Sequence, residues 1–168
     1  MILKDLLKPN LDVVFCGTAA GEVSAKRQAY YAGPGNQFYP VLHKGGFTPK
    51  LLQPQDYEQL LQYNIGLTDL VKLNSGNDNV LDKRDYDVKG FLKKIFTYQP
   101  KIVCFNGKRA AAEFMGTKTK NIKYGLMAGT IGESKLYCAP STSGSARRFW
   151  DEGVWINLKR LTNIIDKM

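Results

Sequence analysis

The chain has 168 residues, of which 43% are hydrophobic and 23% charged, a composition typical of a single soluble globular domain over residues 1–168. No apolar run approaches the roughly 20 residues of a membrane-spanning helix, and the first residues lack the pattern of a secretion signal. We therefore expect a cytoplasmic protein, associated with the nucleoid if prokaryotic, with no membrane role. The net charge of +9 favours a nucleic acid as partner, with a merely basic protein as the alternative.

Four apolar, strand-like runs each end abruptly in small or polar residues. In chain order they are residues 13–17, 65–67, 102–105 and 136–139. Helical patterns cover residues 55–63, 88–98 and 108–115, and a long helix is expected within residues 147–167. Because strands and helices alternate, the sequence predicts a three-layer α/β/α sandwich around a central, mainly parallel sheet of four to five strands.

The residues that follow these runs predict one shared site. In an open parallel sheet, the loops at the carboxyl ends of the strands meet at a single crevice, where ligands of such folds bind. Thr18, Asp69, Asn106 and Ser141 come at or directly after the ends of the four runs. We therefore expect their side chains to gather at one edge of the sheet.

The sequence gives no sign of a metal site or a cofactor. Cys16, Cys104 and Cys138 each lie inside a predicted strand, where a free thiol packs as a small apolar group. None of them belongs to a close pair with the spacing of zinc or iron–sulfur ligands. The single histidine, His43, is isolated and is expected on the surface or in a loop.

Two loop segments have compositions that packing does not readily explain. Residues 30–39 place two glycines around a proline inside an aromatic cluster, which suits close backbone approach and stacking on a ligand. Residues 140–148 are small and rich in hydroxyl groups, and they close with paired arginines at an expected helix start, which suits contacts to phosphates. A structural turn and a solvated Ser/Gly loop are the respective alternatives.

Taken together and in order, five segments resemble the mismatch-specific uracil/thymine DNA glycosylases of the uracil-DNA glycosylase superfamily. Residues 15–21, FCGTAAG, stand in the place of the family's G-x-N-P-G loop, and residues 31–38, YAGPGNQF, are similar to its aromatic Pro-Gly-Asn segment. Residues 63–71 and 98–108 are also similar, and residues 140–147 resemble the loop that penetrates the DNA helix. The resemblance covers nearly the whole chain, from about Val13 to the final helix.

The resemblance implies a monofunctional DNA glycosylase that flips and excises uracil, or another deaminated or mismatched base, from double-stranded DNA and so starts base excision repair. It implies no cofactor, since water is the nucleophile, and a monomer is the default for such a small enzyme. On this basis the base-binding pocket is assigned to Thr18, Ala19, Ala20, Gly21, Tyr31, Asn36 and Asn106, with Tyr31 stacking on the base. The DNA-binding residues are assigned as Lys108, Ser141, Thr142, Ser143, Gly144, Ser145, Ala146, Arg147 and Arg148.

The chain departs from the family pattern at the position of the catalytic asparagine. The asparagine that positions the attacking water falls on Ala19, and the following proline falls on Ala20. The penetrating loop begins with Ala139 and is about two residues longer than in relatives. Because an alanine side chain cannot bind water, we predict that Asp69 is the catalytic residue, with Asn106 as second candidate. The alternative for Asp69 is a turn or helix cap.

A protein of another class also fits these residues. A non-catalytic DNA mismatch- or lesion-binding protein could retain the fold after losing the asparagine at position 19. A nucleotide-binding α/β protein fits less well, because no G-x-x-x-x-G-K-[ST] segment follows the first strand. Uracil, thymine, hypoxanthine and xanthine are all candidate bases for the enzyme.

Overall fold

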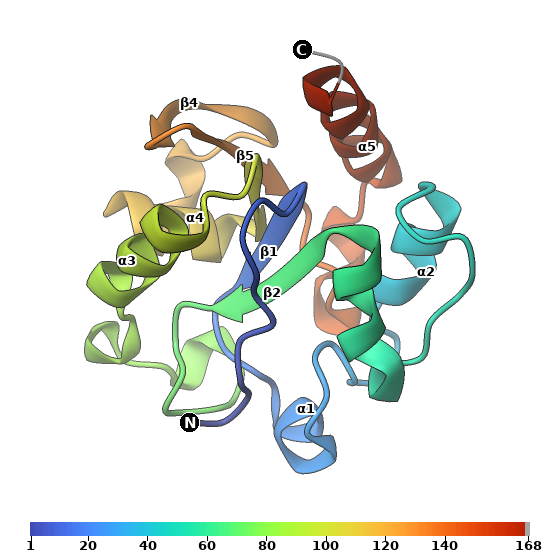
Figure 1. Cartoon of the computed structure of the whole chain (residues 1–168). Helices are drawn as coiled ribbons and strands as arrows, with labels where there is room; N and C mark the ends of the chain where they lie inside the picture. Colours follow the sequence, from blue (N-terminus) through green and yellow to red (C-terminus); the bar gives the residue numbers. More distant parts are fainter. Residues whose placement is uncertain (167–168) are drawn as a thin grey trace.

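The structure is a computed structural model that describes residues 1–166. Within these residues the chain forms a sheet of five strands in the order β2-β1-β3-β5-β4 (Figure 1). The strands are β1 (Val13–Gly17), β2 (Ile65–Asp69), β3 (Ile102–Asn106), β4 (Gly125–Ile131) and β5 (Ser134–Ala139). The α-helices are α1 (Glu22–Arg27), α2 (Phe38–Lys44), α3 (Val88–Tyr98), α4 (Lys108–Met115) and α5 (Glu152–Asp166). The 3₁₀ helices are η1 (Pro54–Tyr63), η2 (Asp78–Val80), η3 (Lys83–Asp85), η4 (Thr119–Asn121) and η5 (Gly144–Phe149).

The sheet confirms the predicted mainly parallel arrangement. β1 pairs in parallel with β2 and β3, and β3 pairs in parallel with β5. β4 is the strand that the sequence pattern missed, and it pairs antiparallel with β5 at the edge of the sheet. Its sequence, GLMAGTI, is mostly exposed and contains two glycines, so it lacks the continuous apolar run that marks the buried strands.

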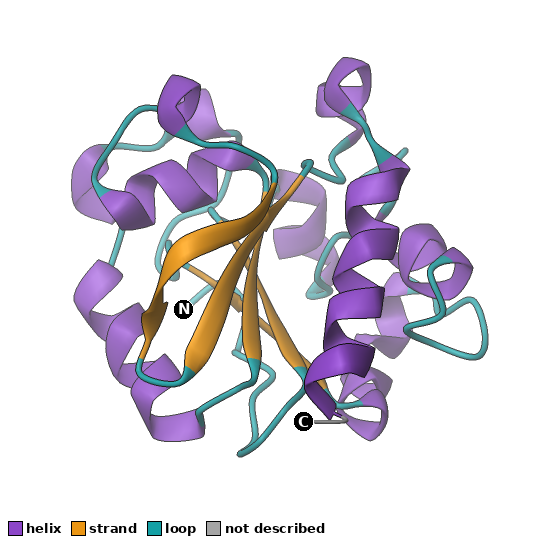
Figure 2. Ribbon diagram, turned by 90° about the horizontal axis from the view of Figure 1, so that it is seen from above, coloured by secondary structure: helices purple, strands orange, loops and turns teal. Residues whose placement is uncertain are grey.

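Helices cover both faces of the sheet (Figure 2). Residues of α2 and α5 pack on one face and residues of α3 and α4 on the other. The predicted helices at residues 88–98 and 108–115 are confirmed, and α5 lies within the predicted range 147–167. Residues 55–63 are helical but of the 3₁₀ type. The helices α1 and α2 were missed because each spans only six or seven residues, too few to show a helical period.

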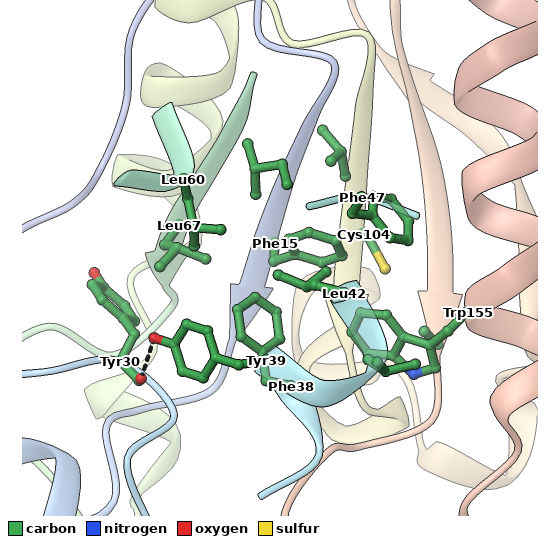
Figure 3. Close-up of a cluster of buried hydrophobic side chains, with 14 of the residues drawn as sticks. Phe15, Tyr30, Phe38, Tyr39, Leu42, Phe47, Leu60, Leu67, Cys104 and Trp155 are labelled. Atoms are coloured by element: carbon green, nitrogen blue, oxygen red, sulfur yellow. Dashed lines mark hydrogen bonds between the residues drawn. The ribbon is translucent and has the colours of Figure 1, made fainter. Parts of the chain in front are cut away.

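Aromatic side chains build the core between β1, α2 and α5 (Figure 3). The ring of Phe15 stacks on Trp155 at a centroid distance of 5.3 Å and meets the edge of Phe38, also at 5.3 Å. All three side chains are fully buried. The indole Nε1 of Trp155 donates a hydrogen bond of 3.0 Å to the carbonyl of Pro140, so the same core fixes the start of the loop after β5.

The cysteines and the histidine lie as expected with respect to solvent. Cys16, Cys104 and Cys138 are free thiols buried in β1, β3 and β5. His43 is exposed, but it belongs to α2 rather than to a loop. Among the described residues, no helix is both long and apolar enough to cross a membrane.

The N-terminal segment closes the free edge of β2. Leu6 and Leu67 exchange two backbone hydrogen bonds of 2.9 Å, and the amide of Ile2 donates to the carbonyl of Lys72 at 2.8 Å. Gly66 makes this close approach possible, because a Cβ at this position would lie 2.7 Å from the carbonyl oxygen of Leu6. The edge strand is thereby covered, which protects it from pairing with another chain.

We predict that Gly66→Ala lowers the free energy of unfolding by about 1–3 kcal/mol, since the added methyl group overpacks this contact. Gly33→Ala is the matched control, because no atom lies within 4 Å of a Cβ at that position. Chemical denaturation of both variants checks the prediction. Equal stability of the two variants would contradict it.

Candidate active site

The carboxyl ends of the parallel strands meet at one edge of the sheet. The register places Gly17 of β1 opposite Asp69 of β2, and Asn106 of β3 opposite Ala139 of β5. The structure therefore brings Asp69 and Asn106 to the same edge as the loops that follow β1 and β5. The parallel pairing of short strands of similar length produces this convergence.

Asp69 is a buried carboxyl group with a perturbed pKa. The residue is 5% exposed, and this burial raises the pKa of its carboxyl group from 3.8 to about 6. The ammonium group of Lys72 opposes the rise, the carboxylate of Asp5 adds to it, and a backbone hydrogen bond with Gly17 opposes it. A carboxyl group in this environment is largely ionised at neutral pH and takes up a proton in mildly acidic solution.

Lys72 and Lys94 pair with Asp5 rather than directly with Asp69. Their ammonium groups lie 2.8 and 2.7 Å from the two Asp5 carboxylate oxygens. Burial raises the pKa of Asp5, but hydrogen bonds from Lys72 and Lys94 outweigh that effect and hold the pKa below its usual value. Thr68 contributes a further hydrogen bond of 2.7 Å to Asp5. This network supplies Asp69 with nearby positive charge through space.

Tyr31 reaches the same edge from the segment after α1. Its backbone adopts a left-handed conformation with φ of 55°, and its ring lies on Phe38 at a centroid distance of 4.1 Å. Burial raises the pKa of the phenol well above its usual value, and the Asp69 carboxylate raises it further, so the hydroxyl group stays neutral. A Cβ on Gly17 would lie 3.4 Å from this hydroxyl oxygen and 2.7 Å from Asp69 Oδ1.

The loop after β1 is fastened to the segment after β2. The amide of Val71 donates to the carbonyl of Thr18 at 2.7 Å, and the amide of Gly76 donates to the carbonyl of Ala20 at 2.9 Å. The Thr18 hydroxyl donates a hydrogen bond of 2.7 Å to Asp78 Oδ1. Sequence reasoning missed Asp78, because 60 positions separate it from Thr18 and no motif links the two.

The loop after β1 has only one polar side chain in residues 18–21, that of Thr18. Ala19 is partly exposed, Ala20 is buried, and Gly21 precedes α1 with its carbonyl accepting a hydrogen bond from the amide of Ala25. Any base recognition through residues 18–21 would therefore use the backbone and the Thr18 hydroxyl. Position 19 therefore offers no side chain that could bind water. Asp69, which is buried at the same edge, can do so.

Asn106 holds the loop after β5. Its amide nitrogen donates to Thr142 Oγ1 at 3.0 Å, and its amide oxygen accepts a hydrogen bond of 3.0 Å from the backbone of Thr142. Thr142 is 1% exposed, so its side chain lies inside the protein rather than on the surface that DNA would contact. The carbonyl of Thr142 accepts a further bond of 2.8 Å from the amide of Gln37, which joins this loop to the segment before α2.

Asn36 and Lys108 also make contacts within the protein. Asn36 Oδ1 accepts a hydrogen bond of 3.0 Å from the amide of Phe38, the first residue of α2, whose ring lies against Tyr31. The ammonium group of Lys108 lies 4.5 Å from the ring centroid of Tyr124. Asn36 thus supports the pocket through Phe38, and Lys108 forms a cation–π contact at the start of α4.

The rest of the loop after β5 is organised by its own hydroxyl groups. The Ser141 hydroxyl accepts a hydrogen bond of 3.2 Å from the amide of Ser143, and the Ser143 hydroxyl accepts one of 3.3 Å from the amide of Ser145. Gly144 lies against the segment before α2, because a Cβ there would approach the carbonyl oxygen of Pro34 to 2.8 Å. This geometry gives the loop a defined shape.

The paired arginines differ from the prediction in one respect. Arg147 and Arg148 lie in η5 with Ala146 and are exposed, whereas α5 begins only at Glu152. They therefore do not start the long helix. Phe149, which follows them, is 56% exposed and packs against the Arg148 guanidinium at 4.7 Å. In the described part of the chain, no three His, Cys, Asp or Glu side chains gather as metal ligands.

The fold and this edge define a three-layer α/β/α protein with a buried carboxyl group at its parallel strand ends. The sequence model of the Uracil DNA glycosylase superfamily matches residues 4–163. The chain therefore belongs to this superfamily, and membership supports a DNA N-glycosylase function. A solution NMR structure of a protein from Methanosarcina acetivorans, provisionally designated a uracil DNA glycosylase, has a TM-score of 0.63 and 21% identity over 96% of both chains. That similarity supports the fold.

Asp69→Asn should stabilise the protein above pH 6. Because the pKa of Asp69 rises from 3.8 to about 6 in the folded protein, ionisation of this group costs folding free energy. The cost is absent below pH 4, grows between pH 4 and 6, and reaches about 3 kcal/mol at higher pH.

Denaturation of both proteins at pH 5 and pH 8 measures this difference. We expect the variant to gain more stability relative to wild type at pH 8 than at pH 5. An effect that is the same at both pH values would contradict the assigned pKa.

Proposed function

We propose that the protein is a monofunctional uracil-DNA glycosylase of the mismatch-specific type, which removes uracil from duplex DNA and so starts base excision repair. The proposal is supported chiefly by Asp69, a buried carboxyl group at the strand ends beside a loop that has alanine at positions 19 and 20. Such a group can do the work of the missing asparagine, because a carboxylate accepts a hydrogen bond from water and stabilises nearby positive charge.

The first step is extrusion of the base from the duplex. Unstacking costs a few kcal/mol and least for a mispaired base, so uracil opposite guanine is the easiest target. Tyr31 is the residue that we propose to receive the base, since its ring is supported by Phe38 at 4.1 Å and the residue is only partly buried. An aromatic face held in this way offers a stacking surface.

The chemical step is hydrolysis of the N-glycosidic bond. The bond between C1′ and the base nitrogen breaks, and its electron pair leaves with the base. Water forms the new bond to C1′, the Asp69 carboxylate accepts a proton from that water, and the departing base gains a proton from solvent. The products are a free base and an abasic sugar. Before water attacks, the negative charge of Asp69 stabilises the positive charge that develops on the sugar.

Duplex DNA is the proposed partner, and a single protein molecule in the cytoplasm or nucleoid would act on it. The net charge of +9 supports attraction to phosphates. The loop after β5 and the exposed arginines of η5 lie beside the proposed pocket, since Asn106 at the strand ends holds Thr142. We propose that these residues contact the distorted duplex.

A non-catalytic lesion-binding protein is the second candidate. It is favoured by one observation, the alanine at the position where relatives carry the water-binding asparagine. Such a protein would bind a mispaired duplex without releasing a base. A test for release of uracil from a U:G duplex decides between the two functions.

We predict that the wild-type protein releases uracil from a duplex with one U:G pair and that Asp69→Ala lowers the single-turnover rate by at least about 100-fold. DNA affinity should stay nearly unchanged, since the buried carboxylate does not contact phosphates. Alkaline cleavage of the abasic product, followed by electrophoresis, measures the rate. Thymine, hypoxanthine and xanthine duplexes and a uracil-containing single strand test the base range.

Glu133→Ala is the matched control for this experiment. Glu133 is an exposed carboxylate in the turn before β5, at the opposite end of the sheet from Asp69. Its loss should leave the rate unchanged. A normal rate in Asp69→Ala would remove Asp69 from the mechanism, and no product from wild type on any substrate would favour the binding protein.

Arg147→Ala and Arg148→Ala should each weaken binding to duplex DNA at low salt and reduce the slope of log K against log salt by about 1. Lys8→Ala is the control, since Lys8 is exposed on the segment that leads to the amino end of β1. Fluorescence anisotropy over a salt series measures both effects. An unchanged slope in both arginine variants would place the DNA elsewhere.

A further inference from the structure

The hydroxyl group of Tyr31 is buried without a hydrogen-bond partner among the described residues. A buried, unpaired hydroxyl destabilises the folded protein, so such a group calls for an explanation. The amide nitrogen of Asn106, which has a second N–H beside the one bonded to Thr142, points toward the phenol oxygen and lowers its pKa, so the O–H of Tyr31 is the group left without an acceptor. The protein therefore leaves a neutral donor unused at its strand ends.

The Tyr31 hydroxyl and the Asp69 carboxylate converge on Gly17. The Cβ position of Gly17 is 3.4 Å from the Tyr31 hydroxyl oxygen and 2.7 Å from Asp69 Oδ1, so the two groups lie within reach of one bridging molecule. No hydrogen bond joins the two groups directly. A neutral phenol that donates and a carboxylate that only accepts together match a water molecule, which does both.

We propose that Tyr31 is a further catalytic residue and that its hydroxyl, together with Asp69, holds the attacking water. This inference rests on the proposed glycosylase function. Water donates one hydrogen bond to the carboxylate and accepts one from the phenol, so its remaining lone pair is oriented for attack on C1′. The phenol thereby supplies the second polar contact that Ala19 does not provide. The ring keeps its role in stacking on the base.

Two substitutions probe this site in different ways. Tyr31→Phe removes the donor and preserves the ring and its contact with Phe38. Gly17→Ala retains both polar groups, but its methyl group would lie 2.7 Å from Asp69 Oδ1 and so pushes the carboxylate away from the Tyr31 hydroxyl. Gly17 does not have a positive φ, so alanine does not strain its backbone dihedral angles.

Tyr86→Phe is the matched control. The Tyr86 hydroxyl is also buried without a hydrogen-bond partner in residues 1–166, but it lies near Arg109 and Glu113 of α4 rather than at Asp69. Removing either hydroxyl relieves an unpaired polar atom, so neither variant should lose thermal stability. Only Tyr31→Phe should lose activity.

The experiment measures single-turnover excision at a U:G pair, affinity for a duplex with a non-hydrolysable uridine analogue, and melting temperature for wild type and all three variants. We expect Tyr31→Phe and Gly17→Ala to lower the excision rate about 100-fold, as misplacement of a reactant can do. Affinity should stay within about 2-fold, because the base still stacks on an aromatic ring. Tyr86→Phe should match wild type in rate.

The outcomes separate this inference from the function on which it rests. Wild-type excision with a normal rate in Tyr31→Phe would overturn the water site and leave the glycosylase proposal intact. A loss of affinity with an unchanged single-turnover rate in Tyr31→Phe would assign the hydroxyl to DNA binding rather than to the attacking water and would also overturn it. Absence of excision by wild type would overturn both proposals.

Discussion

The position of β1 between β2 and β3 is the constraint on which the site depends. Parallel pairing on both sides fixes where β1 ends, and it sets Gly17 directly opposite Asp69. The missing side chain of Gly17 then becomes essential, because Asp69 and Tyr31 both approach its Cβ position. Burial of an ionisable carboxyl group costs folding free energy, and the rigid parallel sheet holds Asp69 in place despite that cost.

Aromatic packing extends this frame from the core to the pocket. Trp155 packs on Phe15, Phe15 meets Phe38, and Phe38 supports the ring of Tyr31. Trp155 also holds the start of the loop after β5 through Pro140, and Asn106 of β3 holds the same loop through Thr142. The proposed stacking surface and the proposed DNA-binding loop are therefore parts of one packed unit, which limits their relative movement.

The electrostatics of the site follow from how its charges are paired. Lys72 and Lys94 neutralise Asp5, so Asp69 receives their attraction without a direct ion pair. The effect of burial on the pKa of Asp69 is therefore larger than that of the lysines, and the pKa lies at about 6. Such a value suits a group that exchanges protons with water near neutral pH. The overall positive charge acts at longer range and attracts phosphates to the same molecule.

The sequence by itself determined the class of fold, four of the five strands, α3 and α4, and the gathering of Asp69 and Asn106 at one edge, because apolar runs and their ends are local signals. It missed β4, whose exposed residues carry no such signal. Tertiary structure alone decided what each polar group contacts. It turned Asn106 and Thr142 toward each other, joined Thr18 to Asp78, and left the Tyr31 hydroxyl unpaired beside Asp69. These pairings join residues far apart in the chain, and only packing brings them together.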